Sequence, residues 1–427
     1  MKIAVVGAGI SGLSAAWLLS RRHEVTLYEQ EGRLGGHSNT VDVEIDGVSH
    51  PVDTGFIVFN RDTYPHLCGL FSLLGVSIAD SDMSFGVSLR EPDIEWAGTN
   101  LASVFAQPAN LARPRFWGML QDILRFNSEV TERAANGSAE HISLGEFLVR
   151  HRYGDAFRDW YLLPMAAAIW SCPTQTMMSY PLATFARFCH NHGLLRVNDR
   201  PQWLTVRGGS REYVKRMAAA LQDVRRASAV KGLQRVSDGV LVQAAGVLER
   251  YDQVVLACHS DEALALLGDT ATAPERRLLG AIRYQPNHAV LHTDTALLPR
   301  NRRVWSSWNY MAGAGAPDSR PVSVSYLMNR LQPLPFEQPV VVSLNPFIEP
   351  DPARVIARID YAHPLFDGLA IDAQARLPEI QGRDRLWYCG AWTGYGFHED
   401  GLASAVRVAR HLGADIPWQR SGEVLAA

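Results

Sequence analysis

The strongest pattern in the chain lies at its start, where an apolar run passes directly into closely spaced glycines. Residues 2–6 form an apolar run of strand length, and residues 7–12 follow with glycines in GxGxxG spacing. Small and apolar side chains then continue in helical order over residues 11–19, and a second segment typical of a strand covers residues 23–28. This order predicts a buried strand, a tight turn, a helix and a second strand beside the first.

The glycine spacing indicates a dinucleotide site. The first glycine allows the tight turn, the second leaves bare backbone beside a phosphate, and the third lets the helix pack close to the strand. The N-terminal amides of the helix then face that anion. Glu29 ends the second strand at the distance where an acid holds ribose hydroxyls. We therefore expect the dinucleotide to contact Gly7, Gly9, Ile10, Ser11, Gly12, Glu29 and Gln30.

Two later parts of the chain repeat the alternation of strand and helix. After Gly208, an amphipathic helix is predicted to reach Leu221, and strand-rich sequence runs from residue 229 to 257. Near the C-terminus, residues 385–392 indicate a strand that enters a glycine, and residues 400–405 open a final helix. Both parts are expected to complete the domain that begins at residue 1.

Two inserts separate these parts. The first becomes helical, with apolar side chains on one face of residues 116–126, and then forms an apolar cluster with a proline break over residues 160–170. The second alternates polar and apolar residues at 304–310 and 322–327, which predicts two strands, and residues 340–344 predict a third. The amphipathic helix either packs into the core or rests its arginines and exposed aromatic residues on a lipid surface.

The predicted fold class is α/β, a Rossmann-like dinucleotide-binding domain interleaved with an α+β substrate domain. The binding domain is expected to be discontinuous, over residues 1–80, 200–280 and 365–427. The substrate domain is expected over residues 81–199 and 281–364. This arrangement places the second domain over the reactive face of the cofactor.

Composition restricts the partners and the compartment. The formal net charge of −3 over 427 residues gives no global argument for binding nucleic acid. Five scattered cysteines without CxxC spacing predict free thiols in a reducing compartment, and we expect no metal site. No apolar run reaches the length of a membrane-spanning helix, and the N-terminal apolar run is interrupted by glycines, unlike a signal peptide. The expected location is cytoplasmic, with peripheral contact at the inner membrane surface left open.

The residues after Glu29 indicate which dinucleotide binds. Arg33, Gly35, Gly36 and His37 form a pattern that resembles the flavoproteins of the amine oxidase and phytoene desaturase superfamily. A guanidinium offers paired donors to a phosphate, and glycines let a flavin approach the backbone. The resemblance implies FAD rather than NAD, bound by a GR2-type flavoprotein fold.

Two further segments extend the resemblance. Asp53-Thr54-Gly55-Phe56 follows a hairpin predicted over residues 41–52, and the C-terminal strand and helix resemble the family's second flavin motif. Such a final helix directs its positive dipole end at the pyrimidine side of the flavin. The resemblance implies further FAD contacts at Arg33, Gly35, Gly36, His37, Thr54, Gly55, Phe56, Val230, Gly390, Ala391, Asp400, Gly401 and Leu402.

Two of these positions are less specific than the others. Many relatives carry an acid after the strand glycine, where this chain has Ala391. Val230 is the candidate for an adenine contact through its backbone, although an ordinary strand valine explains it equally well.

Two residues that many amine oxidases carry near the flavin are missing from this chain, which limits the possible substrates. All lysines are Lys2, Lys215 and Lys231, so the second insert lacks the lysine that many amine oxidases place beside the flavin N5. Alignment on Asp400 puts His398 near the position where those oxidases place a cage tyrosine. A cage for a cationic amine is therefore not evident.

The segment from Tyr395 to Gly401 instead resembles a bacterial subgroup that accompanies cyclopropane-synthase-like lipid methyltransferases. It includes the flavin-dependent desaturases of furan fatty acid synthesis. The resemblance implies desaturation of a methyl-branched unsaturated acyl chain linked to phospholipid, by hydride transfer to flavin N5. His398 is the candidate base, because its unperturbed pKa lies near neutrality, and Glu399 would orient it or accept the proton itself.

The role of His398 and the function of the whole chain both have alternatives. His398 serves equally well as a structural neighbour of the flavin. The alternatives for the whole chain are an amine oxidase, a carotenoid or polyene desaturase, and a flavin-bound partner that assists a lipid methyltransferase without turnover. The expected substrate cavity is lined by Trp170, Trp308, Tyr310, Tyr326 and Asn345, each of which also suits ordinary packing.

Overall fold

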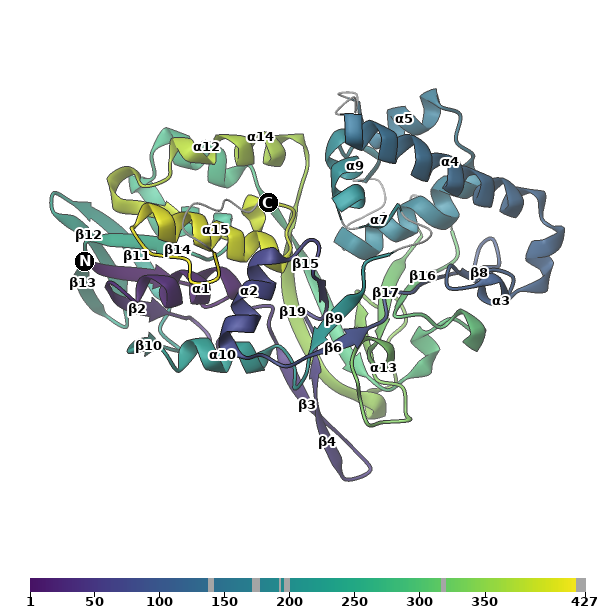
Figure 1. The fold of residues 1–427 in the computed structure, drawn as a ribbon, viewed down its shortest axis with the longest axis horizontal. Coiled ribbons are helices and arrows are strands. Elements are labelled where there is room, and N and C mark those ends of the chain that lie inside the picture. The colour runs from purple at the N-terminus through teal and green to yellow at the C-terminus, as the bar shows by residue number, and fades with distance from the viewer. Residues whose placement is uncertain (137–141, 171–176, 192, 196–199, 316–319, 420–427) are drawn as a thin grey trace.

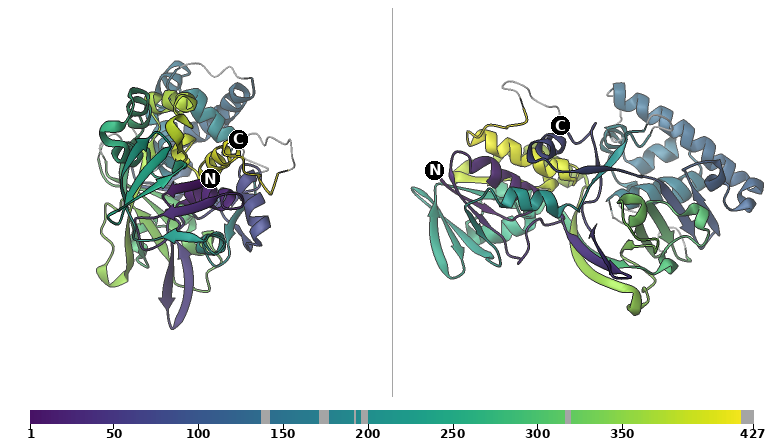
Figure 2. Two further views of the ribbon diagram at one scale, coloured as in Figure 1. Left: turned by 90° about the vertical axis from the view of Figure 1, so that its left-hand side faces the viewer. Right: turned by 60° about the horizontal axis from the view of Figure 1, so that its bottom comes forward.

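The computed structural model describes residues 1–136, 142–170, 177–191, 193–195, 200–315 and 320–419. The chain forms two lobes, with the N-terminus in one lobe and helices α3 and α4 at the far end of the other (Figure 1). Long strands near the middle of the molecule lie between the lobes, as the rotated views also show (Figure 2).

A five-stranded parallel sheet forms the centre of the first lobe. Its strand order is β10-β2-β1-β14-β20, so the N-terminal strand lies in the middle. The strand bounds are β1 Lys2–Val6, β2 Glu24–Tyr28, β10 Asp223–Arg225, β14 Gln253–Leu256 and β20 Leu386–Tyr388. The sheet therefore brings together the N-terminal, middle and C-terminal parts of the chain.

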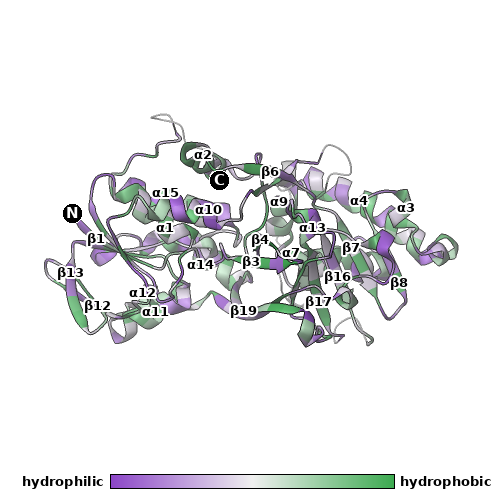
Figure 3. Cartoon of the chain, turned by 90° about the horizontal axis from the view of Figure 1, so that it is seen from below, coloured by the Kyte–Doolittle hydropathy of each residue, from purple (hydrophilic) through white to green (hydrophobic). Residues whose placement is uncertain are grey.

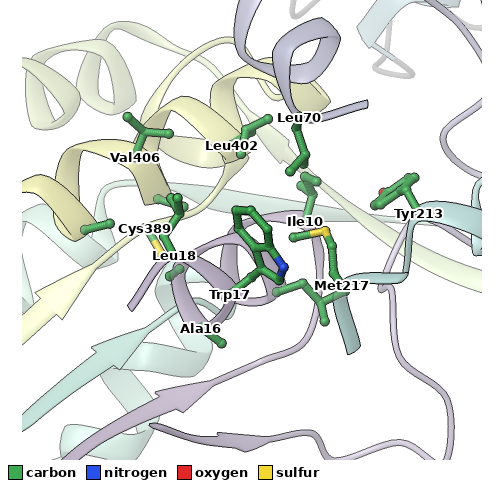
Figure 4. Packing of buried hydrophobic residues seen from close by; sticks show 14 of the residues in the cluster. Ile10, Ala16, Trp17, Leu18, Leu70, Tyr213, Met217, Cys389, Leu402 and Val406 are labelled. Atoms are coloured by element: carbon green, nitrogen blue, oxygen red, sulfur yellow. The ribbon is translucent and has the colours of Figure 1, made fainter. Parts of the chain in front are cut away.

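Helices cover one face of this sheet, and the glycine-rich start of α1 lies against it. Leu70 of α2, Met217 of α10 and Leu402 of α15 pack around Trp17 of α1 (Figure 4). The four helices are α1 Ile10–Leu19, α2 Pro65–Leu74, α10 Arg211–Ala218 and α15 His398–His411. Helix α2 is almost entirely apolar in sequence and is coloured accordingly (Figure 3).

The other face carries a small antiparallel sheet and a second set of helices. Buried residues of these elements join those of β1 and β14 in a second core. The sheet order is β11-β12-β13. The elements are β11 Val230–Val236, β12 Gly239–Ala244, β13 Val247–Tyr251, α11 Ser260–Leu267, α12 Ala273–Gly280 and α14 Gly368–Arg376.

The second lobe contains a seven-stranded mixed sheet of order β19-β15-β18-β17-β16-β7-β8. The long strands β15 and β19 pair with each other over most of their lengths. The bounds are β7 Phe85–Leu89, β8 Ile94–Ala97, β15 Arg283–His292, β16 Trp308–Ala312, β17 Val322–Leu327, β18 Val341–Leu344 and β19 Val355–Leu365. Both predicted inserts contribute strands to this sheet, while the exact division into domains remains a prediction.

A helical layer packs beside the seven-stranded sheet (Figure 1). Its core consists largely of phenylalanine side chains, including Phe126, Phe147 and Phe185. The helices are α3 Leu101–Val104, η1 Pro108–Ala112, α4 Pro114–Asn136, α5 Leu144–Arg150, α6 Asp155–Phe157, α7 Leu163–Trp170 and α9 Leu182–Asn191. The expected break near Pro164 takes the form of a π-helical turn, η2 Arg158–Leu162, that runs directly into α7.

The remaining elements connect the lobes. A hairpin of β3 Thr40–Ile45 and β4 Val48–Asp53 projects from the molecule, as the sequence predicts (Figure 1). A small sheet of order β5-β9-β6 joins β5 Phe59–Asn60, β6 Ile78–Ser81 and β9 Trp203–Val206. Short helices complete the chain: η3 Gly268–Thr270, η4 Thr295–Leu297, η5 Arg302–Val304, α13 Met328–Leu331, η6 Pro352–Arg354, η7 Leu377–Glu379, η8 Arg383–Arg385 and η9 Ala391–Thr393.

Two predicted boundaries are wrong. The strand expected from Val304 begins only at Trp308, because Val304 closes the turn η5, whose start is capped by the side chain of Asn301. The final helix begins at His398 rather than Asp400, so the two candidate catalytic residues belong to its first turn.

Within the described ranges, no helix is both long and apolar enough to cross a membrane. The described cysteines Cys68, Cys189, Cys258 and Cys389 are free thiols, as predicted, and Cys172 lies outside the described residues.

Candidate cofactor and substrate site

One cavity of about 840 Å³ is lined by both lobes. In the first lobe it begins beside Glu29 and Val230, and in the second it reaches Trp308 and Tyr326. Most of the predicted cofactor residues line it: Gly7, Gly9, Ile10, Ser11, Glu29, Gln30, Arg33, Gly36, His37, Thr54, Gly55, Phe56, Val230, Gly390 and Ala391.

The turn between β1 and α1 has the geometry that its glycines predict. Gly7 has a φ of +100°, and a Cβ on Gly12 would lie 1.8 Å from the Gly7 carbonyl oxygen. Gly12 therefore serves packing behind the cavity and does not line it. A Cβ on Gly9 would meet nothing within 4 Å, so the cavity comes directly against bare backbone there.

Glu29 holds this turn in place. Its carboxylate accepts hydrogen bonds from the backbone N–H of Ala8 at 2.8 Å and of Glu31 at 2.9 Å. Arg33 donates to the Gly36 carbonyl at 2.7 Å and pairs with Glu31, and it lines the same part of the cavity. The carboxylate of Glu29 and the guanidinium of Arg33 thus lie at the same end of the cavity.

His37 lines the cavity from the glycine pair. Its ring stacks on Tyr361 of β19 at 4.7 Å, and its Nε2 is a buried atom without a hydrogen-bond partner. Burial lowers the pKa of His37 well below its ordinary value, so the ring is neutral at physiological pH. Gly35, with a φ of +114°, lies behind this segment, where its N–H donates to the Ala8 carbonyl.

These observations fit FAD. The bare backbone at Gly9, the helix N-terminus of α1 and the nearby Arg33 suit a pyrophosphate. Glu29 is placed for a ribose, and the orphaned Nε2 of His37 offers a contact to a polar cofactor atom. Gly390 and Ala391 border the cavity at the end of β20, where the resemblance places the flavin.

The segment Thr54-Gly55-Phe56 lies against the same wall. A Cβ on Gly55 would lie 2.2 Å from the His37 carbonyl oxygen, so only glycine allows the two backbones to meet. The Thr54 hydroxyl donates to the Asn39 carbonyl at 3.0 Å. Phe56 stacks face to face on His398 at 3.8 Å.

His398, the candidate base, is held by hydrogen bonds at one of its ring nitrogens. Its Nε2 lies 2.9 Å from the Ser38 hydroxyl and 2.8 Å from the Tyr213 hydroxyl. Burial lowers the pKa of His398 to about 3, so the imidazole is a poor proton acceptor at neutral pH. His398 borders the cavity, and its contacts make it a residue that positions Phe56 and the start of α15.

The assignment of Glu399 also changes. Its two carboxylate oxygens accept hydrogen bonds from the backbone N–H groups of His66 at 2.7 Å and Leu67 at 3.0 Å, at the start of α2. It does not line the cavity, and it caps a helix rather than orienting His398. Burial raises the pKa of Glu399 to about 7.

The next three predicted cofactor residues support the site from behind. Asp400 accepts a hydrogen bond from the Phe397 N–H at 2.9 Å. A Cβ on Gly401 would lie 2.8 Å from the Ser11 hydroxyl, so this glycine lets α15 pack against the start of α1. Leu402 is buried in the core between the helices (Figure 4). None of the three lines the cavity, which corrects their assignment as direct contacts.

Some of the predicted substrate residues line the cavity and others do not. Trp308 and Tyr326 line the cavity and meet edge to face with ring centroids 5.0 Å apart. Tyr310 is fully buried within the sheet, and Asn345 donates to Asn287 outside the cavity, so both are corrected to structural residues. Trp170 ends α7, and its side chain lies outside the described part of the structure.

Sequence reasoning missed the wall formed by β19. Tyr361 and His363 lie two positions apart on this strand, and both line the cavity, with their rings parallel at 6.4 Å. Burial lowers the pKa of His363 to about 4. The alternation of aromatic and small residues from Tyr361 to His363 was the available signal, because side chains at i and i+2 share a face of a strand.

The second-lobe part of the cavity is mainly apolar. Its lining includes Ile57, Met83, Phe188, Leu194, Trp308 and Leu344. The Trp308 indole N–H is buried and has no hydrogen-bond partner within the protein. This part would accept a long hydrocarbon chain.

The fold and the site together define a dinucleotide-binding flavoprotein whose cavity is lined by both lobes. The family model for flavin-containing amine oxidoreductases matches residues 10–301, and the chain belongs to that family. It is an FAD-dependent oxidoreductase by class.

Two curated relatives resemble parts of the chain. A carotenoid phi-ring synthase from Streptomyces griseus is 33% identical over 177 residues, which cover 36% of this chain and 32% of that protein. A polyenoic fatty acid isomerase from Ptilota filicina is 31% identical over 117 residues, which cover 26% of this chain and 22% of that protein. The matches thus span about a third or less of each relative.

Solved structures match the whole fold. A fatty acid isomerase from P. acnes that produces CLA has a TM-score of 0.67 at 16% identity, with 96% of this chain and 98% of that chain covered. Wild-type putrescine oxidase bound to putrescine has a TM-score of 0.68 at 15% identity, with 96% and 99% covered. At such identities the likeness concerns the fold alone.

Proposed function

We propose that this chain is a flavin-dependent desaturase of a methyl-branched, unsaturated fatty acyl chain carried by a phospholipid, as in furan fatty acid synthesis. The observation that carries the proposal is the apolar, aromatic-lined part of the cavity beyond the cofactor residues. Bound FAD supplies the hydride acceptor for such a reaction. The named activities of the two curated relatives, on carotenoids and on polyenoic fatty acids, support a long unsaturated substrate.

The proposed reaction removes two hydrogens from the acyl chain. In such a reaction a C–H bond beside an existing double bond would give up a hydride, for which bound FAD would be the acceptor, and the adjacent C–H bond would lose a proton as the new double bond forms. A carbocation stabilised by the neighbouring double bond would make that second hydrogen strongly acidic, so a weak base would suffice to accept it. The neutral His398 and the helix-capping Glu399 are therefore compatible with the proposal.

The protein's part is to position the chain and exclude competing reactions. Trp308 and Tyr326 form a rigid wall in the second lobe, and the partnerless indole N–H of Trp308 favours a ligand with an oxygen acceptor over a pure hydrocarbon. An acyl ester offers such an oxygen and a carotenoid hydrocarbon does not. This contrast supports the acyl substrate over the carotenoid alternative.

Product analysis tests the proposal. The FAD-loaded protein is incubated with a methyl-branched unsaturated phospholipid, an acyclic carotenoid precursor and a panel of primary amines, and the products are resolved by mass spectrometry. Loss of two hydrogens from the phospholipid alone is expected. Conversion of the carotenoid or an amine alone overturns the acyl assignment, and no conversion with any of them favours a flavin-bound partner of a lipid methyltransferase.

A further inference from the structure

A chain of side-chain hydrogen bonds runs from the sheet of the second lobe to His363 in the cavity wall. Asn345, which follows β18, donates to the Asn287 Oδ1 at 2.7 Å. The Nδ2 of Asn287 lies 3.0 Å from the His363 Nδ1 and donates to the Gln285 carbonyl at 3.2 Å. Asn287 is fully buried on β15, and His363 is its diagonal neighbour on the paired strand β19. The three side chains therefore form one connected network behind the cavity.

Backbone groups at two points fix the direction of each bond in this chain. The Asn345 Oδ1 accepts a hydrogen bond from the backbone N–H of His288 at 2.9 Å, so the amide nitrogen of Asn345 faces Asn287. The Asn287 oxygen is then the acceptor of that bond. The backbone carbonyl of Gln285 can only accept, so it too requires the nitrogen of Asn287 on its side. The Asn287 amide therefore donates to the His363 Nδ1.

This direction decides the tautomer of His363. A neutral imidazole has one nitrogen that donates and one that accepts, and the Nδ1 of His363 is the acceptor. Burial lowers the pKa of His363 to about 4, so at physiological pH the ring is neutral and carries its proton on Nε2. Among the described residues no group accepts from this Nε2–H, and the ring lines the cavity. The Nε2–H is thus a donor available to a bound molecule.

His363 lies on the cofactor part of the cavity wall. Its ring centroid is 5.2 Å from that of His37, and Tyr361 on the same face of β19 also stacks on His37. His37 follows Gly36, whose Cβ would meet the Gly9 Cα at 3.1 Å. The three rings therefore adjoin the turn where the cofactor pyrophosphate is expected. The phosphate and ribityl oxygens of FAD are acceptors for a donor in this part of the wall.

We propose that His363 binds FAD by donating its Nε2–H to a phosphate or ribityl oxygen, and that Asn287 and Asn345 are positioning residues that hold the imidazole in the tautomer this contact needs. A donor whose proton and orientation are fixed before binding loses little conformational freedom when the cofactor binds. The inference goes beyond the proposed function, because it concerns the cofactor and holds for any substrate.

Two substitutions of His363 separate a cofactor contact from a packing role. The amide atoms of Asn occupy the level of Nδ1, one bond beyond Cγ, whereas those of Gln reach the level of Nε2. His363→Gln therefore retains a donor toward the cavity, and His363→Asn retains only the contact with Asn287. Titration of the apoprotein with FAD, followed by flavin fluorescence, is expected to give a Kd about tenfold higher for His363→Asn and within about threefold of the wild type for His363→Gln. Equal FAD affinity of His363→Asn and the wild type, or a greater loss with His363→Gln than with His363→Asn, overturns the proposal.

His288→Asn is the matched control on the neighbouring strand. The His288 side chain is 71% exposed and pairs with Asp360, and its substitution leaves in place the backbone N–H that Asn345 needs. FAD affinity is expected to be unchanged in this variant. The melting temperature of each apoprotein establishes that the variants are folded.

Binding of ADP to the same variants distinguishes the two acceptors. A contact to a phosphate weakens the binding of ADP as well as FAD in His363→Asn, whereas a contact to a ribityl hydroxyl weakens the binding of FAD alone. Either result supports the donor, provided that FAD affinity falls.

The tautomer is measured on the wild type. Two-bond nitrogen–proton correlation spectra of protein labelled with isotopic histidine distinguish protonated from unprotonated ring nitrogens, and the signals that are absent in His363→Gln identify His363. A proton on Nε2, with Nδ1 unprotonated, is expected at neutral pH in the apoprotein and in the FAD-loaded protein. A proton on Nδ1 in either form overturns the proposal.

Discussion

The imidazole of His398 is held between the Phe56 ring and two hydroxyl groups, those of Ser38 and Tyr213. His398→Ala is expected to destabilise the fold by about 2–4 kcal/mol, because it deletes a buried ring and leaves those hydroxyls without their partner. The measurement is urea unfolding of the FAD-loaded protein.

The pH profile of the same variant separates positioning from base catalysis. The pKa of His398 lies near 3, so the imidazole is neutral throughout pH 5–8 in the folded protein. The wild type and His398→Ala are therefore expected to show pH–rate curves of the same shape over this range, whatever their absolute rates. A wild-type inflection near pH 6 that vanishes in the variant would restore His398 as the base.

The effect of substituting Glu399 on the free energy of unfolding is expected to depend on pH. Its folded pKa is raised to about 7, so its contribution to stability falls as pH rises from the unfolded value near 4.3 through 7. Glu399→Gln is expected to cost about 1 kcal/mol at pH 5, since one helix-capping acceptor is lost. That cost should shrink by pH 8, where the wild type holds a buried charge, and urea unfolding at both pH values measures it. A cost that grows with pH contradicts the assignment.

In the turn between β1 and α1, Gly9 is expected to matter for FAD binding and Gly12 for folding. Gly9→Ala adds a methyl group that meets nothing in the protein, whereas Gly12→Ala places one 1.8 Å from the Gly7 carbonyl oxygen. Gly9→Ala is expected to leave the apoprotein within about 0.5 kcal/mol of the wild type while weakening FAD binding at least tenfold. Gly12→Ala should lose both stability and FAD.

Equilibrium titration with FAD and unfolding of the apoprotein distinguish these cases. Unchanged FAD affinity in Gly9→Ala would mean that the pyrophosphate does not approach this turn. The two variants differ by the position of a single methyl group, so each serves as the control for the other.

The sequence predicts elements best where their cause is local. The glycine turn, the hairpin up to Asp53 and the strands β17 and β18 follow from short patterns of apolar and polar residues, and all are present. The roles of His398 and Glu399 depend instead on partners far away in the chain: Ser38 is 360 residues from His398, and His66 is 333 from Glu399. No local pattern carries that information. The alternation at Tyr361 and His363 is a local signal for one face of β19, but it does not show that this face borders the cavity.

At the scale of the whole molecule, the buried carboxylate of Asp53 joins the lobes. It accepts hydrogen bonds from the Ser210 N–H at 2.9 Å, beside α10, and from the Gln332 side chain at 2.8 Å, after α13. The Gln332 side-chain oxygen in turn accepts from the Asp53 N–H at 2.9 Å. The pair of Asp53 and Gln332 therefore connects the first lobe with the second lobe.

Gln332→Ala is expected to cost about 2–3 kcal/mol, since it leaves a buried N–H and part of a buried carboxylate unpaired. The exposed Gln338→Ala is the control and should change stability by less than about 0.5 kcal/mol. Thermal unfolding of both variants with FAD bound measures the difference. Equal melting temperatures of Gln332→Ala and Gln338→Ala would show that the hydrogen bonds between Asp53 and Gln332 contribute little to stability.

Anaerobic stopped-flow absorbance at the oxidised-flavin band tests directly whether an unsaturated acyl chain reduces the flavin. The FAD-loaded protein is mixed with methyl-branched unsaturated phospholipid and, separately, with its fully saturated counterpart and a panel of amines. Rapid bleaching by the unsaturated lipid alone is expected, because only its C–H bonds beside a double bond are activated for hydride loss. Bleaching by an amine alone, with the lipids inert, would contradict it.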